Sequence, residues 1–187
     1  MKQKQNKPKK KERSPEQVIR KRLENVMLRQ EYESLLLRIV ITVLIFAVLF
    51  SKVFLLMRAS GNDMFPAVKD GDVLLAWRLE NKYAKNDVLV YEMDGVVRTG
   101  RVLACGGDVV TLDDSGTVLV NGTAQSGEIV YPTYADKNTE YPYRVPEGYV
   151  FVLGDYRTEA IDSRELGPIP LQSVKGTVIT ILRRRGI

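Results

Sequence analysis

A long apolar run near the start of the chain dominates its hydrophobic pattern. Residues 35–57 carry charged side chains only at Arg38 and Lys52. The uninterrupted apolar core, Ile39 to Phe50, is 12 residues long. This is shorter than the ~20 residues of a typical spanning helix, so Lys52 must extend its amine toward the outer headgroups. No small-x-small cleavage site precedes Arg58, so we predict an uncleaved transmembrane helix over the whole run.

The segment before the apolar run, 15–34, predicts a cytoplasmic amphipathic helix. Ser14 suits the N-cap, Pro15 the first helical position and Gln17 a capping box. The apolar face is suited to a partner helix or to the inner leaflet, although simple continuation of the membrane helix is the preferred interpretation. The apolar positions are Ile19, Leu23, Val26, Met27 and Leu35, and the charged positions opposite them are Arg20, Lys21, Glu24 and Glu31.

Short β-rich runs separated by turn residues follow the apolar run. Several of them alternate or are continuously apolar, and Asn121-Gly122 favours a tight hairpin turn because both residues tolerate positive φ. No useful helical period occurs beyond Met57. The pattern predicts a mainly β, antiparallel, partly barrel-like domain over 58–187. The predicted strands are 72–77, 87–92, 96–103, 109–112, 117–120, 149–153 and 174–182.

Charge is distributed unevenly along the chain. Residues 1–34 hold 11 Lys or Arg against 5 Asp or Glu, a net of +6, whereas residues 60–182 hold 11 against 18, a net of −7. The basic tail, 1–14, should be disordered. The positive-inside rule places this end in the cytoplasm and the β domain outside the cell, with the lipid bilayer as a partner. Nucleic acid is disfavoured because no aromatic residues interleave the basic ones.

The absence of histidine narrows the available chemistry. The chain has no His and a single Cys, Cys105. Ser-His and Cys-His triads and imidazole metal sites are therefore excluded, and no intramolecular disulfide can form. We expect no metal and no other cofactor.

The stretch Gly61–Asp72 holds the candidate chemistry. It resembles the active-site box of the type I signal peptidases, membrane serine proteases of the S26 type that remove secretory signal peptides. In that family the nucleophilic Ser precedes Met-x-Pro and a short loop that ends in Gly-Asp. Here Met64 and Pro66 match, and the Ser position falls on Asp63.

Two later stretches extend the resemblance in the family's order. Residues 101–108 resemble the second box, and the position of its general-base Lys falls on Gly100. Residues 154–167 resemble the third box, and the Ser that supports the Lys falls on Ala160. The resemblance implies a signal peptidase-like fold with a small inserted subdomain at about 109–149.

The replaced residues remove the family's reaction. A Ser-Lys protease needs a hydroxyl beside an unprotonated amine. Asp63 has no hydroxyl and Gly100 has no base, so we predict a non-catalytic protein with a degenerate dyad. The alternative is an active peptidase with altered catalytic residues that cleaves pilin signal peptides.

The retained motif residues have a structural interpretation and a functional one. The resemblance assigns structural roles to Arg101, Asp155, Asp162 and Arg164, with Asp162 expected to pair with Arg164 and Arg101 as a further candidate. A groove for an extended peptide or partner is the functional interpretation. A carboxylate in such a groove should find a cation or show a raised pKa. The predicted groove residues are Asn62, Asp63, Met64, Phe65 and Pro66.

Within the family, the chain is similar to the dyad-lacking, SipA-type proteins of Gram-positive pilus loci. This likeness implies a protein of the cell membrane that assists pilus assembly as a chaperone or scaffold. Its expected partners are pilin precursors or other pilus assembly proteins. A third alternative is self-association through 15–57, which would make a homo-oligomer with the outer domain as a spacer.

Overall fold

The computed structural model describes residues 15–125, 131–136 and 139–183. Its contacts divide the chain into two units, Met1–Leu49 and Phe50–Ile187. The first unit holds most of the long helix and the second holds the strands. The predicted disordered tail, 1–14, lies outside the described residues. Ser14, the predicted N-cap of the helix, is one of these residues.

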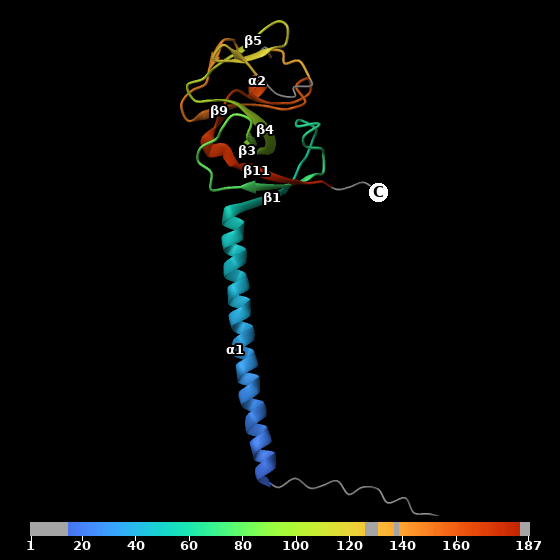
Figure 1. Cartoon of the computed structure of the whole chain (residues 1–187), viewed down its shortest axis with the longest axis vertical. Helices are drawn as coiled ribbons and strands as arrows, with labels where there is room; N and C mark the ends of the chain where they lie inside the picture. Colours follow the sequence, from blue (N-terminus) through green and yellow to red (C-terminus); the bar gives the residue numbers. More distant parts are fainter. Residues whose placement is uncertain (1–14, 126–130, 137–138, 184–187) are drawn as a thin grey trace, which may run out of the picture. The chain divides into compact units, whose positions relative to one another are not determined.

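Helix α1 (Pro15–Val53) begins at Pro15, the residue predicted for the first helical position. The two predicted helical segments form one uninterrupted helix (Figure 1). It has 39 residues, which corresponds to a length of about 58 Å. Its segment Asn25–Val53 is long and apolar enough to cross a membrane.

The prediction that this helix continues to the end of the apolar run is wrong. The helix ends at Val53, and strand β1 (Phe54–Arg58) follows, paired antiparallel with β2 (Val73–Trp77). Phe54 lies opposite Trp77, and the centroids of their rings are 5.1 Å apart. An apolar run is compatible with helix or strand. Residues 54–58 form a strand because they pair with β2.

Strand β1 is one edge of a seven-stranded sheet with the order β1-β2-β11-β3-β4-β9-β10. Within the described residues no pairing joins β1 to β10, so the sheet is open. Register shifts between neighbouring strands mark bulges, which bend a sheet. The mainly β, antiparallel fold predicted from the sequence is confirmed. The other strands are β3 (Val88–Met93), β4 (Val96–Cys105), β9 (Tyr149–Leu153), β10 (Ile169–Pro170) and β11 (Val174–Leu182).

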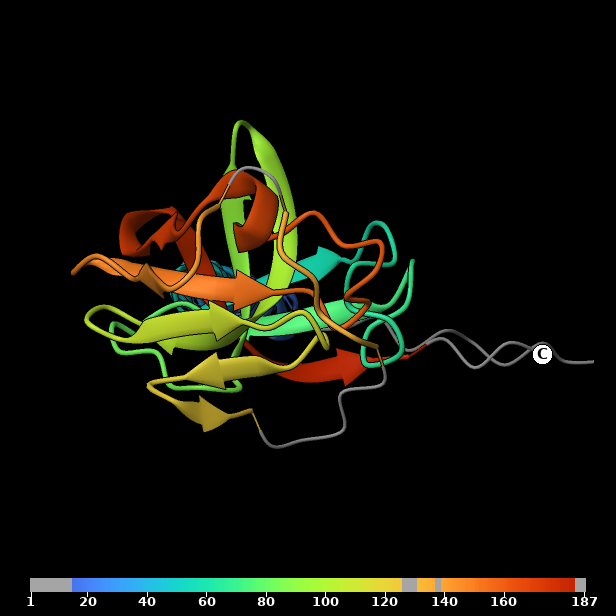
Figure 2. The ribbon, with the colours of Figure 1, turned by 90° about the horizontal axis from the view of Figure 1, so that it is seen from above.

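A second, four-stranded sheet has the order β7-β6-β5-β8 and lies within residues 109–149, where the resemblance implied an insertion. Figure 2 shows β5 to β7, in yellow, gathered on one side of the domain. Asn121 and Gly122 have φ angles of 52° and 77° and form the predicted turn between β6 and β7. The strands are β5 (Val109–Leu112), β6 (Val118–Val120), β7 (Thr123–Ala124) and β8 (Tyr143–Arg144).

The predicted strands agree with the structure to within two residues at each end. The sequence analysis missed β1, β7, β8 and β10, and the short helix α2 (Ser163–Leu166). Two-residue strands and a single helical turn are shorter than the windows over which a hydrophobic period is measurable.

Three clusters of buried apolar side chains hold the domain together. One includes Tyr91 and Val152, from β3 and β9, and another includes Met64. The third packs Val110 of the insertion near Phe151 of β9. Strands β3, β4 and β9 therefore form a rigid base for the residues that the sequence analysis singled out.

Candidate functional site

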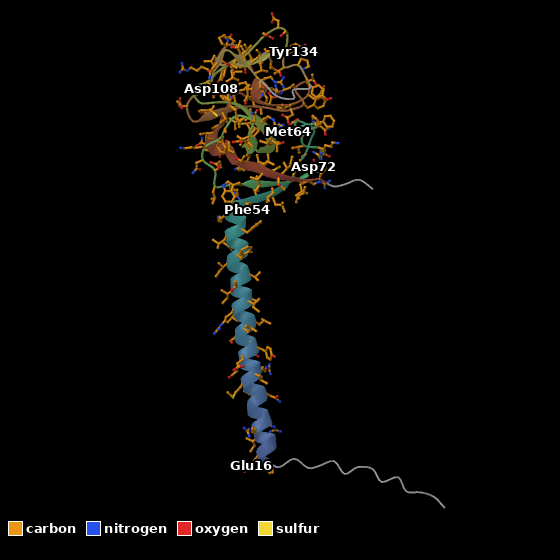
Figure 3. All side chains as sticks on the ribbon, in the orientation of Figure 1. Glu16, Phe54, Met64, Asp72, Asp108 and Tyr134 are labelled. Atoms are coloured by element: carbon orange, nitrogen blue, oxygen red, sulfur yellow. The ribbon has the colours of Figure 1, made fainter. Side chains whose placement is uncertain are left out.

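The Asp63 loop, residues 59–72, connects β1 to β2 and is closed by its own hydrogen bonds. Ala59 N donates to Asp72 O at 2.7 Å, and Lys69 N donates to the Asp72 carboxylate at 3.0 Å. Asp72 is 4% exposed. Figure 3 labels Asp72 and Met64 in this part of the domain. The loop is therefore a fixed platform for Asp63.

The prediction that Met64 lines a groove is wrong. Met64 is 1% exposed and packs with Val68 and Leu74 in the core. Its long, unbranched side chain fills the space under the loop. Of the other predicted groove residues, Asp63 and Phe65 are half-buried, and Asn62 and Pro66 are exposed.

The third box, residues 154–167 and called the third motif below, packs directly against the backbone of Asp63. Tyr156 N donates to Asp63 O at 2.9 Å. A Cβ added to Gly154 would lie 2.5 Å from Asp63 O and would also clash with the Cβ of Ala160. Only glycine fits this contact. The structure thus brings Asp63, Gly154 and Ala160 together, and Ala160 places a methyl group there and no hydroxyl.

The Asp63 carboxylate faces a cation that the sequence analysis did not name. Its Oδ2 lies 3.9 Å from Nη1 of Arg98, and the two side chains are 24% and 21% exposed. Burial raises the pKa of the Asp63 carboxyl above its ordinary value of 3.8. Arg98 opposes this shift, and the charge of Asp162 adds to it. The expectation of a nearby cation or a raised pKa is confirmed on both counts.

Gly100, at the position of the family's base, is buried in the middle of β4. A Cβ there would lie 3.2 Å from Cγ2 of Val152 and 3.3 Å from Cε1 of Tyr91, so a side chain would need both to shift. Arg98 is two residues earlier on the same strand. Because side chains alternate along a strand, it faces the same side as position 100. This alternation is the signal that would have identified Arg98 from the sequence.

Tyr91 lies directly opposite Arg98 across the β3–β4 pair. The tyrosine is fully buried, and its pKa is raised by burial and by the charge of Asp162. In the part of the chain that the structure describes, neither the Tyr91 hydroxyl nor Nε of Arg98 has a hydrogen-bond partner. Tyr91 is therefore a second member of this site that the sequence analysis missed.

The retained charged residues form two separate pairs. Arg164 donates from Nε and Nη2 to the two Asp162 oxygens, each at 2.9 Å, which confirms the predicted pair. Arg101 donates to both oxygens of Asp155, at 2.8 and 2.6 Å. The alternative that Arg101 pairs with Asp162 is wrong, because these two bonds engage its guanidinium with Asp155. Both pairs are bidentate, which fixes orientation as well as charge.

A third arginine, Arg157, joins the third motif to the insertion. It is 3% exposed, and it donates to Gly154 O at 2.8 Å and to Thr133 Oγ1 at 2.7 Å. Burial lowers the pKa of this guanidinium. The sequence analysis gave Arg157 no role, although it lies inside the third motif.

These side chains can form hydrogen bonds, but they do not provide a nucleophile beside a base. The arginine guanidinium stays protonated and cannot act as a base. Within the described residues there is no group of three or more His, Cys, Asp or Glu that could hold a metal ion. The Asp63 carboxyl, whose pKa is raised, faces Arg98 at 3.9 Å.

Comparisons with known proteins agree with the sequence motifs. Residues 32–182 match the family described as "Signal peptidase, peptidase S26". Signal peptidase I of Bacillus licheniformis is 29% identical over 161 residues, which cover 78% of this chain and 83% of that protein.

Two other comparisons match a smaller part of this chain. The probable thylakoidal processing peptidase 2 of Arabidopsis thaliana is 33% identical over 129 residues, which cover 62% of this chain. The chain spans about a third of that relative's length, 34%. A crystal structure of a signal peptidase I from Enterococcus faecalis V583 has 28% identity and a TM-score of 0.43, and covers 53% of this chain and 97% of that one.

Proposed function

The chain belongs to the peptidase S26 family of signal peptidases, and on this premise we propose that it does not cleave signal peptides but assists pilus assembly. In this proposal it is a chaperone or scaffold that binds pilin precursors or other pilus assembly proteins. Helix α1 anchors it in the cell membrane, with the N-terminus in the cytoplasm and residues 58–187 outside.

One observation carries the loss of catalysis. The nucleophile position holds a carboxylate that faces Arg98, and the base position is a glycine at which any side chain would require Val152 and Tyr91 to shift. Neither a hydroxyl nor an unprotonated amine is available at these positions. Loss of the supporting hydroxyl at Ala160 removes a third part of the same machinery.

The pilus role is supported by the likeness to the dyad-lacking proteins of pilus loci. The relatives named above are peptidases by name, and this chain departs at all three of these positions from the motifs that the family resemblance implies. A retained fold with a lost dyad fits a protein that binds the same class of secreted precursor without cutting it.

The test uses the full-length chain in detergent micelles with a pilin precursor. Mass spectrometry should detect no loss of the signal peptide, while an active signal peptidase I cleaves in parallel. Coprecipitation should recover the precursor with the chain. Cleavage by the unmodified chain would overturn the proposal, and failure to recover any precursor would remove the chaperone part of it.

A double variant, Asp63→Ser with Gly100→Lys, adds a gain-of-function arm. Its thermal unfolding must be checked first, because a side chain at position 100 displaces Tyr91 and Val152. Cleavage by the folded double variant would show that precursors reach this site. In cells, pilus assembly that persists in Asp63→Ala would argue against a peptidase that depends on Asp63.

The second candidate is a peptidase with altered catalytic residues, and the raised pKa of Asp63 favours it. A carboxyl that titrates closer to neutrality can exchange protons during a reaction. This candidate requires cleavage that disappears in Asp63→Ala. The same mass-spectrometric assay decides between the two functions.

A further inference from the structure

We propose that Asp63 and Arg98, with Tyr91 beside them, form a binding site for an amide group of a partner polypeptide. The inference rests on the proposed function, because it names how a non-catalytic member would hold its partner. Arg98 donates to the amide carbonyl oxygen, and the Asp63 carboxylate accepts from the amide N–H.

The site contains hydrogen-bonding atoms that the fold itself does not use. The Tyr91 hydroxyl and Nε of Arg98 are buried donors without a partner in the described part of the chain. Nη1 of Arg98 stays 3.9 Å from Asp63, which is beyond hydrogen-bond distance. Buried polar groups are normally paired, so two unpaired donors near one carboxylate mark a place where the fold leaves hydrogen bonding incomplete.

The charges of the site select the ligand class. Asp63 and Arg98 together have no net charge, so the pair gives neither a free carboxylate nor an ammonium a net electrostatic attraction. A neutral group with adjacent acceptor and donor satisfies both residues. The primary amide of an Asn or Gln side chain has this arrangement on one edge, and an extended backbone has it where the N–H and C=O of one residue point to the same side.

Access to the pair is retained. The side chains of Asp63 and Arg98 are 24% and 21% exposed, so the pair is partly open to solvent. Tyr91 is fully buried and lies directly opposite Arg98 on the neighbouring strand. Long arginine side chains adjust readily, and a guanidinium that is not hydrogen-bonded to Asp63 is free to turn toward a carbonyl oxygen.

An aromatic row continues from the same loop. The centroids of Phe65 and Tyr156 lie 5.9 Å apart, and those of Tyr156 and Tyr131 lie 4.9 Å apart. All three rings are half-buried. Such rings provide apolar contact area for the side chains that flank a bound amide.

The test measures binding of two uncharged probes to the full-length chain in detergent micelles by NMR titration. A capped Ala-Val peptide carries only backbone amides, and propionamide represents the side-chain amide of Asn or Gln. Arg98→Met should weaken binding by about fivefold or more, the effect of one lost hydrogen bond. Asp63→Asn keeps an acceptor oxygen but loses its charge, so it should weaken binding by a smaller factor. Thermal unfolding must show that both variants fold.

A matched control is available in the same sheet. Lys175 and Glu92 form an ion pair at 2.9 Å with side chains 40% and 42% exposed. Glu92→Gln removes the same charge as Asp63→Asn and should leave binding unchanged. Binding of the peptide that depends on Asp63 and Arg98 assigns the site to backbone amides, and binding of propionamide alone assigns it to side-chain amides.

The inference is overturned if neither probe binds, or if both variants bind as tightly as the unmodified chain. In that case precursor coprecipitation and the absence of cleavage can still hold, so the proposed function survives. Cleavage of the precursor removes the proposed function and leaves the binding result to be judged separately.

Discussion

Gly154 is the residue at which the Asp63 loop and the third motif meet. The loop carbonyl and the Ala160 methyl group occupy the space that any Cβ at this position would need. Gly100 is also enclosed, but the atoms nearest to its absent Cβ belong to the side chains of Val152 and Tyr91. Side chains can move by a few tenths of an ångström, whereas the loop backbone cannot move without disturbing its hydrogen bonds.

Gly154→Ala should therefore destabilise the domain more than Gly100→Ala does. We expect a loss of about 3 kcal/mol or more in the free energy of unfolding for Gly154→Ala, and of about 1 kcal/mol for Gly100→Ala. Urea unfolding of the full chain in micelles measures both. Equal losses would contradict the distinction between backbone and side-chain contacts.

The carboxyl of Asp63 makes a second residue-scale prediction, on pH. Its pKa is raised in the folded chain, so the folded state keeps this proton to a higher pH than the unfolded state. The stabilisation is complete below the unfolded pKa and is lost as the pH rises through the folded pKa. Relative to Asp63→Asn, the unmodified chain should lose free energy of unfolding as the pH rises through and above the ordinary carboxyl pKa of 3.8.

Asp108→Asn is the control, with the opposite sign. Burial raises the pKa of Asp108, but hydrogen bonds from Cys105 N and the Asn121 side chain outweigh this effect and lower it. The unmodified chain should therefore gain stability relative to Asp108→Asn as the pH rises. If both comparisons change in the same direction, the assigned environment of Asp63 is wrong.

At the scale of elements, strand β1 joins the end of the apolar run to the sheet. All five of its residues pair with β2, from Phe54 opposite Trp77 to Arg58 opposite Val73. The last helical residue, Val53, accepts a hydrogen bond from Arg78 N at 2.9 Å. The segment after the helix is therefore part of the folded domain and not a linker.

A fragment that begins at residue 50 should fold, whereas one that begins at residue 59 should be less stable. Removing β1 leaves β2 as an unpaired edge and takes away several backbone hydrogen bonds. We expect a loss of at least about 2 kcal/mol and a tendency to associate. Chemical unfolding and size-exclusion chromatography test this, and equal stability of the two fragments would contradict the role of β1.

At the scale of the whole domain, Arg157 links the insertion to the Asp63 loop. Thr133, which is fully buried, accepts from Arg157, and Arg157 donates to Gly154 O. Gly154 in turn packs against Asp63 O. The insertion and the candidate site are thus joined by a continuous set of buried contacts.

Thr133→Val should lower the free energy of unfolding, because it leaves Nη1 of the buried Arg157 guanidinium without the acceptor that lies at 2.7 Å. The expected loss is about 1.5–3 kcal/mol, the usual value for hydrogen bonds to charged groups. Thr123→Val, at an exposed position on β7, is the control and should cost less than about 0.5 kcal/mol. NMR signals of Asp63 and Tyr156 should shift in Thr133→Val, and unchanged signals would deny the connection.

The sequence by itself determined the elements whose signal is local. Apolar runs located the main strands, Pro15 located the start of the helix, and Asn121-Gly122 located a hairpin turn. The resemblance of the third box to the family's motif made the pairing of Asp162 with Arg164 predictable. The three replaced positions of the dyad and its support were likewise readable from motif order, because each depends on residue identity alone.

Tertiary structure decided what depends on long-range partners. The apolar residues after Val53 became a strand because β2 offered an edge, and Met64 turned inward because the core under its loop had space for it. Arg101 reached Asp155 and Arg98 reached Asp63, since strand pairing determined which charges came together. A local pattern specifies periodicity and turns, whereas the pairing of distant charges requires the sheet that carries them.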